Sequence, residues 1–209
     1  MNICDSVRAG TTVLSGAGSY KITAAGKYKI ILRGGTGYYQ ITRHCDPPPR
    51  STSTTYYGSG GVLTATKEFS KGVTLTIKTI GGSSYGASDS CSRANATSRS
   101  WSGGAGVAFW AGGSAPVLAA GGGGSEGYAG GGGFSGGGGS KSSGYNWTGA
   151  TGSSGVSCNG KCTASGGDSG GAGYCESGYT CIASNAGNGQ AGASASVIYC
   201  GPTSSSPCP

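Results

Sequence analysis

Apolar and polar residues alternate along much of the first part of the chain, and this pattern predicts antiparallel β-strands. In residues 72–80, GVTLTIKTI, the apolar residues Val73, Leu75 and Ile77 occupy every second position. Successive side chains of a strand point to opposite faces, so one face of this strand is expected to be buried and the other solvated. Further strands are predicted at residues 19–23, 26–33, 38–42 and 62–66, with glycine-containing turns between them.

Two polar segments of the same region lack this alternation. Residues 46–60 contain the run Pro47, Pro48 and Pro49, and proline cannot donate a ladder hydrogen bond, so a surface excursion is expected there. Residues 86–100, GASDSCSRANATSRS, have no periodicity and are expected to form an exposed loop. Because no stretch has a useful helical period, the fold class expected is all-β.

The second half predicts a hairpin that leads into a block of glycine. The runs GVAFWAGG and APVLAAGGGG read as its two strands, and ASVIYC at 195–200 reads as a closing strand. Residues 121–140 contain thirteen glycines in twenty positions, which fits either a flexible linker or extended threefold helices whose backbones hydrogen-bond to one another. Glu126, Tyr128 and Phe134 interrupt the block, and a tether would not need aromatic residues. The ordered interpretation is therefore favoured, with these three residues at the ends of glycine passes.

Composition indicates a fold with a small apolar core. Glycine occupies 47 of 209 positions, and only 10% of the residues are charged, so backbone hydrogen bonds and cross-links are expected to hold the chain together. Residues 1–100 carry a net charge of +8 and residues 101–209 a net charge of −1. We expect a basic β-sheet half at 1–100 and a glycine- and cysteine-rich half at 101–209, joined in one integrated domain.

The basic residues are scattered over strand-like segments, which is typical of a solvated sheet face and not of a nucleic-acid groove. No nucleic-acid partner is expected, although a weak attraction to anionic surfaces such as acidic glycans stays open. No run of 18 apolar residues occurs, so no membrane insertion is expected either.

Nine cysteines favour disulfides over zinc. The spacings differ from paired zinc-binding units, and the chain has one histidine, His44. The six disulfide candidates are Cys158, Cys162, Cys175, Cys181, Cys200 and Cys208, and the odd ninth cysteine is expected to be free or bonded to another subunit. No metal and no cofactor are expected. Disulfides imply an oxidising destination, so an extracellular or virion-surface location is predicted, reached by lysis or after removal of a signal segment.

One motif argues for an enzyme. Residues 167–171, GDSGG, match the nucleophile signature of trypsin-like proteases, and His44, Asp89 and Ser169 follow the chain order of their triad. Asp89, however, stands in a polar segment that offers no apolar surroundings to bury it, and a GDSGG match is easily reached by chance in such a sequence. We therefore expect no enzymatic activity and keep the protease as a remote alternative.

The order of segments resembles the glycine-rich domain of phage tail-fibre and tail-tip adhesins. GKYKIILRGGTG is similar to the opening strand of that domain, and GGVLTATKEFSKGVTLTIKTIGGSS is similar to its next two strands. GVAFWAGGSAPVLAAGGGGSEGYAGGGG resembles the hairpin that runs into polyglycine, although the nine cysteines are a departure from the family. The resemblance implies an antiparallel, jelly-roll-like β-sandwich with a bundle of polyglycine helices, which displays variable loops to a cell-surface receptor.

Recognition is expected to fall to exposed aromatic and polar residues, because aromatic rings stack on sugars and anchor protein contacts. The candidates are Tyr145, Asn146, Trp147, Tyr174, Tyr179, Arg99 and Trp101. The alternative for each aromatic is a lid packed on the glycine helices. The partners expected are a receptor, either a glycan or an outer-membrane protein, other virion proteins, and copies of the chain in a homo-oligomer. A second hypothesis is a self-assembling subunit of an extracellular filament or coat, joined through edge strands.

Overall fold

The structure is a computed structural model that describes residues 7–43, 51–56, 58–81, 84–88, 97–124, 149–150, 156–159, 170–171, 173–185 and 192–209. Over these residues the fold is all-β, as predicted, and every strand pairing is antiparallel. The described part of the chain contains no helix, and so none of a length and apolarity that could cross a membrane.

The largest sheet has six strands drawn from both halves of the sequence. Their order is β1 (Thr12–Ser15), β17 (Ser194–Gly201), β3 (Gly26–Arg33), β6 (Gly61–Phe69), β16 (Thr180–Asn185) and β13 (Val156–Asn159). The closing strand predicted at 195–200 is thus confirmed as β17, and it pairs with β3 near the other end of the chain. The basic half and the cysteine-rich half are interleaved within this one sheet.

A second sheet has five strands in the order β15 (Tyr174–Cys175), β11 (Leu118–Ala120), β10 (Gly106–Ala111), β7 (Thr74–Ile80) and β2 (Gly18–Lys21). It contains the predicted hairpin as β10 and β11. The alternation in β7 is confirmed: Leu75 and Ile77 are buried, while Thr74 and Lys78 are exposed. A separate short pair joins β12 (Gly149–Ala150) to β14 (Gly170–Gly171).

The main core cluster takes residues from both of these sheets. At its centre Tyr28 of β3 contacts Phe69 of β6 and Tyr199 of β17, with ring centroids 5.9 and 5.1 Å apart. Phe69 in turn lies 6.4 Å from Phe109 of the five-stranded sheet. Aromatic pairs with tilted or edge-on rings at such distances add to the stabilisation from burial, so a few large side chains supply much of this small core.

The buried hydroxyl of Tyr28 makes the stability of the fold depend on pH in the alkaline range. Tyr28 Oη donates to the carbonyl oxygen of Ala24 at 2.6 Å, and burial raises the pKa of this phenol from 10.0 to about 12. A raised pKa means that the folded state holds the proton more tightly. The resulting stabilisation is therefore fully present below pH 10 and is lost as the pH rises through 12.

We expect the unfolding temperature to fall steeply between pH 10 and pH 12, the ordinary and raised pKa values of Tyr28. Tyr28→Phe, which costs about 1 kcal/mol at neutral pH through the lost hydrogen bond, should flatten this fall. Thermal unfolding followed by circular dichroism across that pH range measures both effects. Parallel pH profiles for the two proteins would contradict the assignment.

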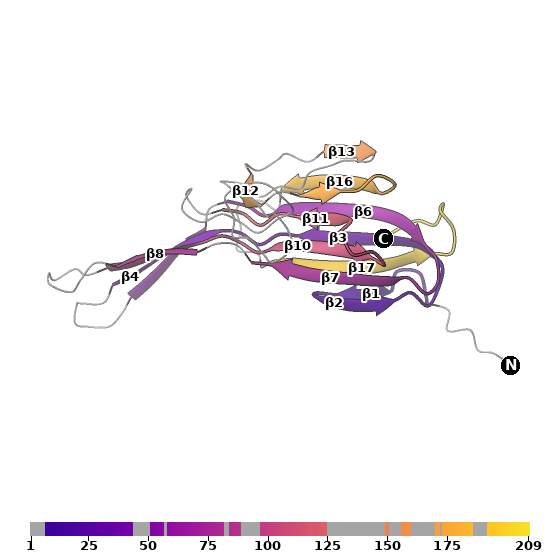
Figure 1. Ribbon diagram of the computed structural model, residues 1–209, viewed down its shortest axis with the longest axis horizontal. Coiled ribbons are helices and arrows are strands. Elements are labelled where there is room, and N and C mark those ends of the chain that lie inside the picture. Colours follow the sequence, from indigo (N-terminus) through magenta and orange to yellow (C-terminus); the bar gives the residue numbers. More distant parts are fainter. Residues whose placement is uncertain are drawn as a thin grey trace.

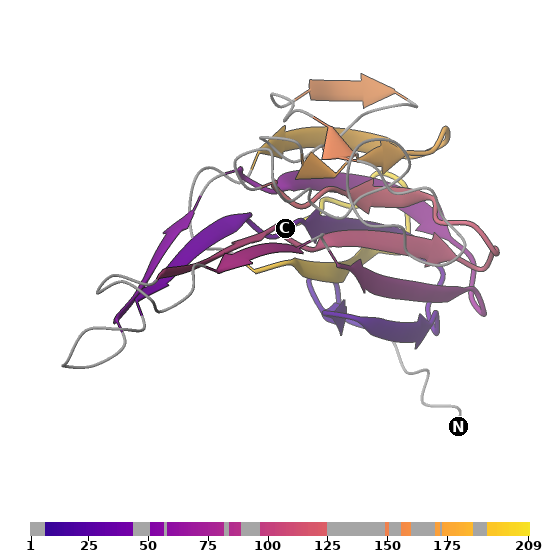
Figure 2. The ribbon, with the colours of Figure 1, turned by 60° about the vertical axis from the view of Figure 1, so that its left-hand side comes forward.

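A third sheet projects from one end of the main body and is called the arm here (Figures 1 and 2). Its four strands are in the order β5 (Ser51–Tyr56), β4 (Tyr38–Arg43), β9 (Thr97–Ser102) and β8 (Ser84–Ser88). Two sequence predictions are wrong here. The excursion expected at 46–60 contains β5, and the loop expected at 86–100 contains the end of β8 and most of β9. Both segments are rich in serine and threonine and lack the apolar residue at every second position by which a strand is recognised, so no strand was predicted there.

The arm joins the body through four glycine-rich segments, residues 34–37, 58–61, 103–105 and 121–124, called the neck here. The first three connect an arm strand directly to a body strand: β4 to β3, β5 to β6, and β9 to β10. The fourth follows β11 and opens the glycine block. Residues 125–140 lie outside the described residues, and so do Glu126, Tyr128 and Phe134.

Backbone hydrogen bonds link the neck segments to one another. Gly34 N–H donates to the carbonyl of Gly61 at 2.9 Å, and Gly35 N–H donates to Ala105 at 2.8 Å. The carbonyl of Gly35 also accepts from Gly123 N–H at 2.8 Å. Segment 34–37 therefore bonds to all three of the others. The segments approach so closely that a Cβ atom added to a glycine of one segment would collide with the backbone of another segment.

Candidate functional site

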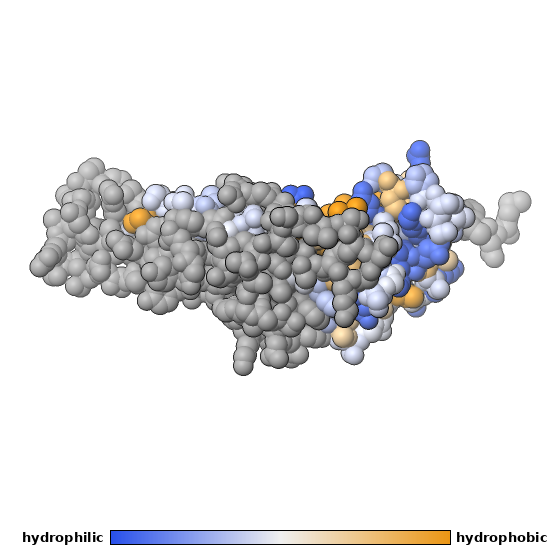
Figure 3. All heavy atoms as spheres, turned by 90° about the horizontal axis from the view of Figure 1, so that it is seen from above, coloured by the Kyte–Doolittle hydropathy of each residue, from blue (hydrophilic) through white to orange (hydrophobic). Residues whose placement is uncertain are grey.

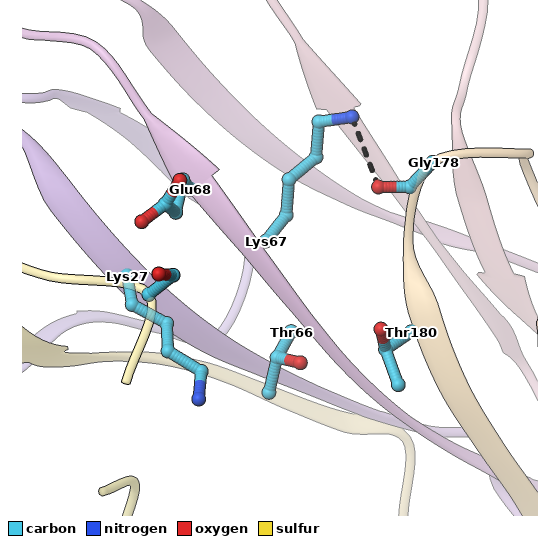
Figure 4. Close-up of a pocket in the computed structure, with 7 residues that line it drawn as sticks. Lys27, Thr66, Lys67, Glu68, Gly178 and Thr180 are labelled. Atoms are coloured by element: carbon cyan, nitrogen blue, oxygen red, sulfur yellow. Dashed lines mark hydrogen bonds between the residues drawn. The ribbon is translucent and has the colours of Figure 1, made fainter. Parts of the chain in front are cut away.

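The structure has a surface groove at the end of the body farthest from the neck, called the distal groove here (Figure 4). Its volume is about 560 Å³, and its lining is Lys27, Thr66, Lys67, Glu68, Gly178, Thr180 and Ser204. Strands β3 and β6 meet the neck at Arg33 and Gly61, so Lys27 and Glu68 stand at their opposite ends. Figure 3 shows strongly hydrophilic residues gathered at this end of the body.

Strand register explains how these side chains come together. Lys27 lies directly opposite Glu68 in the β3–β6 pair, and Thr66 lies directly opposite Thr180 in the β6–β16 pair. Opposite residues of antiparallel strands share a face, so all four lie on the face of the six-stranded sheet that points away from the main core. These four positions are thus a consequence of the alternation that buries Tyr28 on the other face, whereas Lys67 lies opposite Tyr28 and leaves the sheet on the core-facing side.

Each of the two lysines in the groove is held by a backbone acceptor. Lys67 Nζ donates to the carbonyl oxygen of Gly178 at 3.2 Å and lies 4.4 Å from the centroid of the Tyr179 ring (Figure 4). Lys27 Nζ donates to the carbonyl oxygen of Ser206 at 3.2 Å. An ammonium group has three donors, and these contacts use one hydrogen-bond donor of each lysine.

The wall at Ser204 belongs to a C-terminal segment that a disulfide fastens to the sheet. Cys200 at the end of β17 is bonded to Cys208, and Lys29 Nζ donates to the carbonyl oxygen of Pro209. Within the segment, Ser206 Oγ lies 3.0 Å from Thr203 Oγ1. These contacts hold residues 202–209 against the outer face of the sheet beside the groove.

The structure contains disulfides, as the cysteine content predicted. Cys175 of β15 is bonded to Cys181 of β16, which links the five-stranded sheet to the six-stranded one, and Cys200 is bonded to Cys208. Cys158 of β13 lies opposite Cys181 in the strand register. The remaining candidate, Cys162, lies outside the described residues, as do Cys4, Cys45 and Cys91.

The structure places the recognition candidates in different surroundings. Tyr179 is 5% exposed, belongs to the main core and lies 6.3 Å from the ring of Phe69, so we assign it a packing role. Burial raises its pKa, with a smaller contribution from Glu176. Tyr174 is half-buried and packs against Trp110 and its neighbours on the other face of the five-stranded sheet. Both tyrosines pack against apolar side chains of the sheets, whereas the lid alternative expected packing on the glycine segments.

Two other candidates, Arg99 and Trp101, lie on β9 in the arm. Trp101 stands opposite Tyr39 of β4 and Tyr85 of β8, which puts three aromatic positions in one row across the sheet. Tyr145, Asn146 and Trp147 lie outside the described residues. The distal groove was not among the sequence predictions, because its lysines and threonines come from strands whose pairing the sequence did not reveal.

The three residues of the protease alternative, His44, Asp89 and Ser169, all lie outside the described residues. Their neighbours belong to different parts of the fold. Arg43 and Ser88 end β4 and β8 in the arm, whereas Gly170 pairs with Ala150 in the short β12–β14 pair beside the body (Figure 1). Among the described residues, no group of three or more His, Cys, Asp or Glu side chains is arranged to hold a metal ion.

No family model matches the chain, and no characterised protein or solved structure is significantly similar to it.

Proposed function

We propose that this chain is a non-enzymatic adhesion module that acts outside the cell, as a host-recognition or surface component of a phage-like virion. The observation that carries the proposal is the arm, a four-stranded sheet displayed at one end of a body whose described residues include two disulfides. On its described face the arm is polar: Gln40 donates to Thr54 at 3.2 Å, and Thr42 lies 3.2 Å from Thr52. Such a polar face is suited to binding another molecule through direct and water-mediated hydrogen bonds.

We further infer that the neck is a bundle of polyglycine helices. A strand in a flat sheet has at most two hydrogen-bonded neighbours, whereas segment 34–37 and segment 121–124 each bond to three others. Three neighbours require bonds that radiate around an extended chain, which a threefold helix without side chains provides. Together with the two sheets that share a core, this arrangement supports the interpretation as a β-sandwich with polyglycine helices.

A rigid neck would serve adhesion because it fixes the arm relative to the body before any contact is made. Preorganisation reduces the entropy that binding must overcome. The polyglycine neck supplies this rigidity from backbone hydrogen bonds, and the disulfides keep the body intact in an oxidising medium.

The test is direct binding of the purified, fluorescently labelled chain to a panel of bacterial cells, measured by flow cytometry. We expect saturable binding to a subset of strains, reduced about tenfold or more by Trp101→Ala or Trp147→Ala, since aromatic anchors often contribute 2 kcal/mol or more. Ile182→Ser, at a residue of the body that is 55% exposed, is the control and should bind as the parent does. Binding to no strain, or equal binding by all variants, would refute the proposal.

The second candidate function, a self-assembling subunit, is favoured by the free edge of the arm. Strand β5, STSTTY, has no charge and no proline and pairs on one side only among the described residues. Unprotected edges of this kind are templates for strand addition. Electron microscopy and sedimentation of the same preparation decide this: polymers that Thr54→Lys dissolves support the filament, and a discrete particle excludes it.

A further inference from the structure

We propose that the distal groove binds an acidic saccharide, that is, a sugar that carries carboxylate groups. This inference rests on the proposed function, because it names a ligand class for a second surface of the adhesion module. The groove lies at the opposite end of the body from the arm, so the two surfaces would contact different parts of a cell coat.

Charge gives the first part of the argument. On the outer face of the sheet, Lys27 lines the groove opposite a single carboxylate, Glu68, and Lys29 lies on the same face one row away. The local balance is therefore cationic. Hydrogen bonds between an ammonium and a carboxylate are roughly twice as strong as neutral ones, so an anionic ligand gains most here.

Preorganisation gives the second part. A free lysine loses rotamer entropy when a ligand fixes it. Lys27 is already fixed by its hydrogen bond to Ser206, whereas Lys67 lies opposite Tyr28 and its ammonium is held on the core-facing side of the sheet, against the ring of Tyr179. Because the protein has ordered Lys27, its remaining donors can bind a carboxylate with a smaller entropic cost.

The rest of the lining matches the hydroxyls of a sugar. Thr66, Thr180 and Ser204 can each donate and accept a hydrogen bond, and Glu68 can accept from a sugar hydroxyl. In Figure 4, Thr66 and Thr180 stand side by side on neighbouring strands, on the same side as the Lys27 ammonium, while the Lys67 ammonium points away from them toward Gly178. This set would hold a polar ligand on several sides.

Size and lining exclude simpler ligands. The volume of about 560 Å³ lies in the range of small-molecule sites, about 300–1,000 Å³, and far exceeds the roughly 30 Å³ of one water molecule, so a bare anion would leave the groove mostly empty. None of its lining residues is apolar or aromatic, which disfavours a lipid chain or a stacked nucleobase. An acidic saccharide uses both the cations and the hydroxyls.

The experiment uses trigalacturonate as the charged probe and its fully methyl-esterified form as the neutral probe of the same length. Isothermal titration of the whole chain should show binding of the charged probe that weakens with added salt, and at least tenfold weaker binding of the ester. Lys27→Gln should weaken trigalacturonate binding about tenfold, the loss expected for one charge-assisted hydrogen bond.

Lys21→Gln is the matched control, because it removes the same charge from an exposed position on β2 in the other sheet. It should leave the affinity for trigalacturonate within about twofold of the parent, as expected for a distant, screened charge. Unchanged unfolding temperatures would show that neither variant has lost its fold.

The outcomes separate this inference from the proposed function. Failure of trigalacturonate to bind, equal binding of the ester, or equal effects of Lys27→Gln and Lys21→Gln would overturn the inference, even if the chain still binds whole cells. Conversely, trigalacturonate binding that depends on Lys27, in a chain that binds no cells, would support the groove and refute the adhesion module.

Discussion

Replacing Gly123 by alanine should destabilise the protein severely. A Cβ at this position would collide with the backbone of Gly58 and Ser59, well inside the 3.0 Å that real Cβ atoms essentially never approach. Backbone cannot move aside as a flexible side chain can, so the neck segments must separate and lose their mutual hydrogen bonds. We expect a loss of about 3 kcal/mol or more, and hence a fall in unfolding temperature of roughly 6–12 °C.

Gly113→Ala is the matched control, because the same methyl group would meet nothing within 4 Å at that position. Alanine restricts the unfolded chain, so this variant should be neutral or more stable by about 0.4–1 kcal/mol. The same glycine-to-alanine change is therefore expected to lower the free energy of unfolding at position 123 and to leave it unchanged or raise it at position 113, and calorimetry of the two variants measures both. Equal unfolding temperatures for Gly123→Ala and the parent would mean that the neck does not pack in solution as it does in the structure.

The alternation of apolar and polar residues identified only those strands that have one face buried in the core. In β3 every second residue from Tyr28 to Leu32 is fully buried, which is why GKYKIILR could be recognised from its alternation alone. The arm strands carry serine and threonine on positions such as Thr52 and Thr54, and no sheet packs on that face among the described residues. A strand without a buried face has no reason to alternate, so its sequence resembles that of a loop.

The neck was predicted only in part. The sequence indicated ordered glycine at 121–140, in several passes, and of this block residues 121–124 are described and form backbone hydrogen bonds. The structure brings residues 121–124 against three short segments that each end a strand: 34–37, 58–61 and 103–105. Two or three glycines at a strand end look like an ordinary turn, and their common role depends on pairings between residues far apart in the chain.

The distal groove could not be predicted for the same reason. Lys27 and Lys67 are 40 positions apart in the sequence, and Gly178 and Ser204 come from two further segments. Lys27 and Lys29 lie on the outer face of their sheet, as the interpretation of the scattered basic residues predicted, whereas Lys67 lies on the core-facing side against Tyr179. The C-terminal segment holds Lys27 in place and the β15–β16 turn holds Lys67, and the disulfides fix both segments. The spacing of the cysteines does not reveal the disulfide connectivity, so this arrangement could not be predicted.

Removing the disulfide between Cys175 and Cys181 is expected to have the second large effect. It joins β15, an edge strand of two residues, to β16 of the other sheet, and the turn between them carries the buried Tyr179. The double variant Cys175→Ala/Cys181→Ala should lose about 2–4 kcal/mol. Tyr179 should then become exposed and lose its raised pKa, which ultraviolet titration of the phenols measures.

The double variant Cys200→Ala/Cys208→Ala is the comparison, because its loop has a similar length but holds a C-terminal segment whose residues are mostly exposed. That segment can detach while both sheets stay folded, so the free energy of unfolding should change by less than about 1 kcal/mol. Its release would remove the acceptor of Lys27 at Ser206, and trigalacturonate affinity should fall instead. An equal loss of stability in the two variants would mean that the C-terminal segment is as necessary to the fold as the link between the sheets.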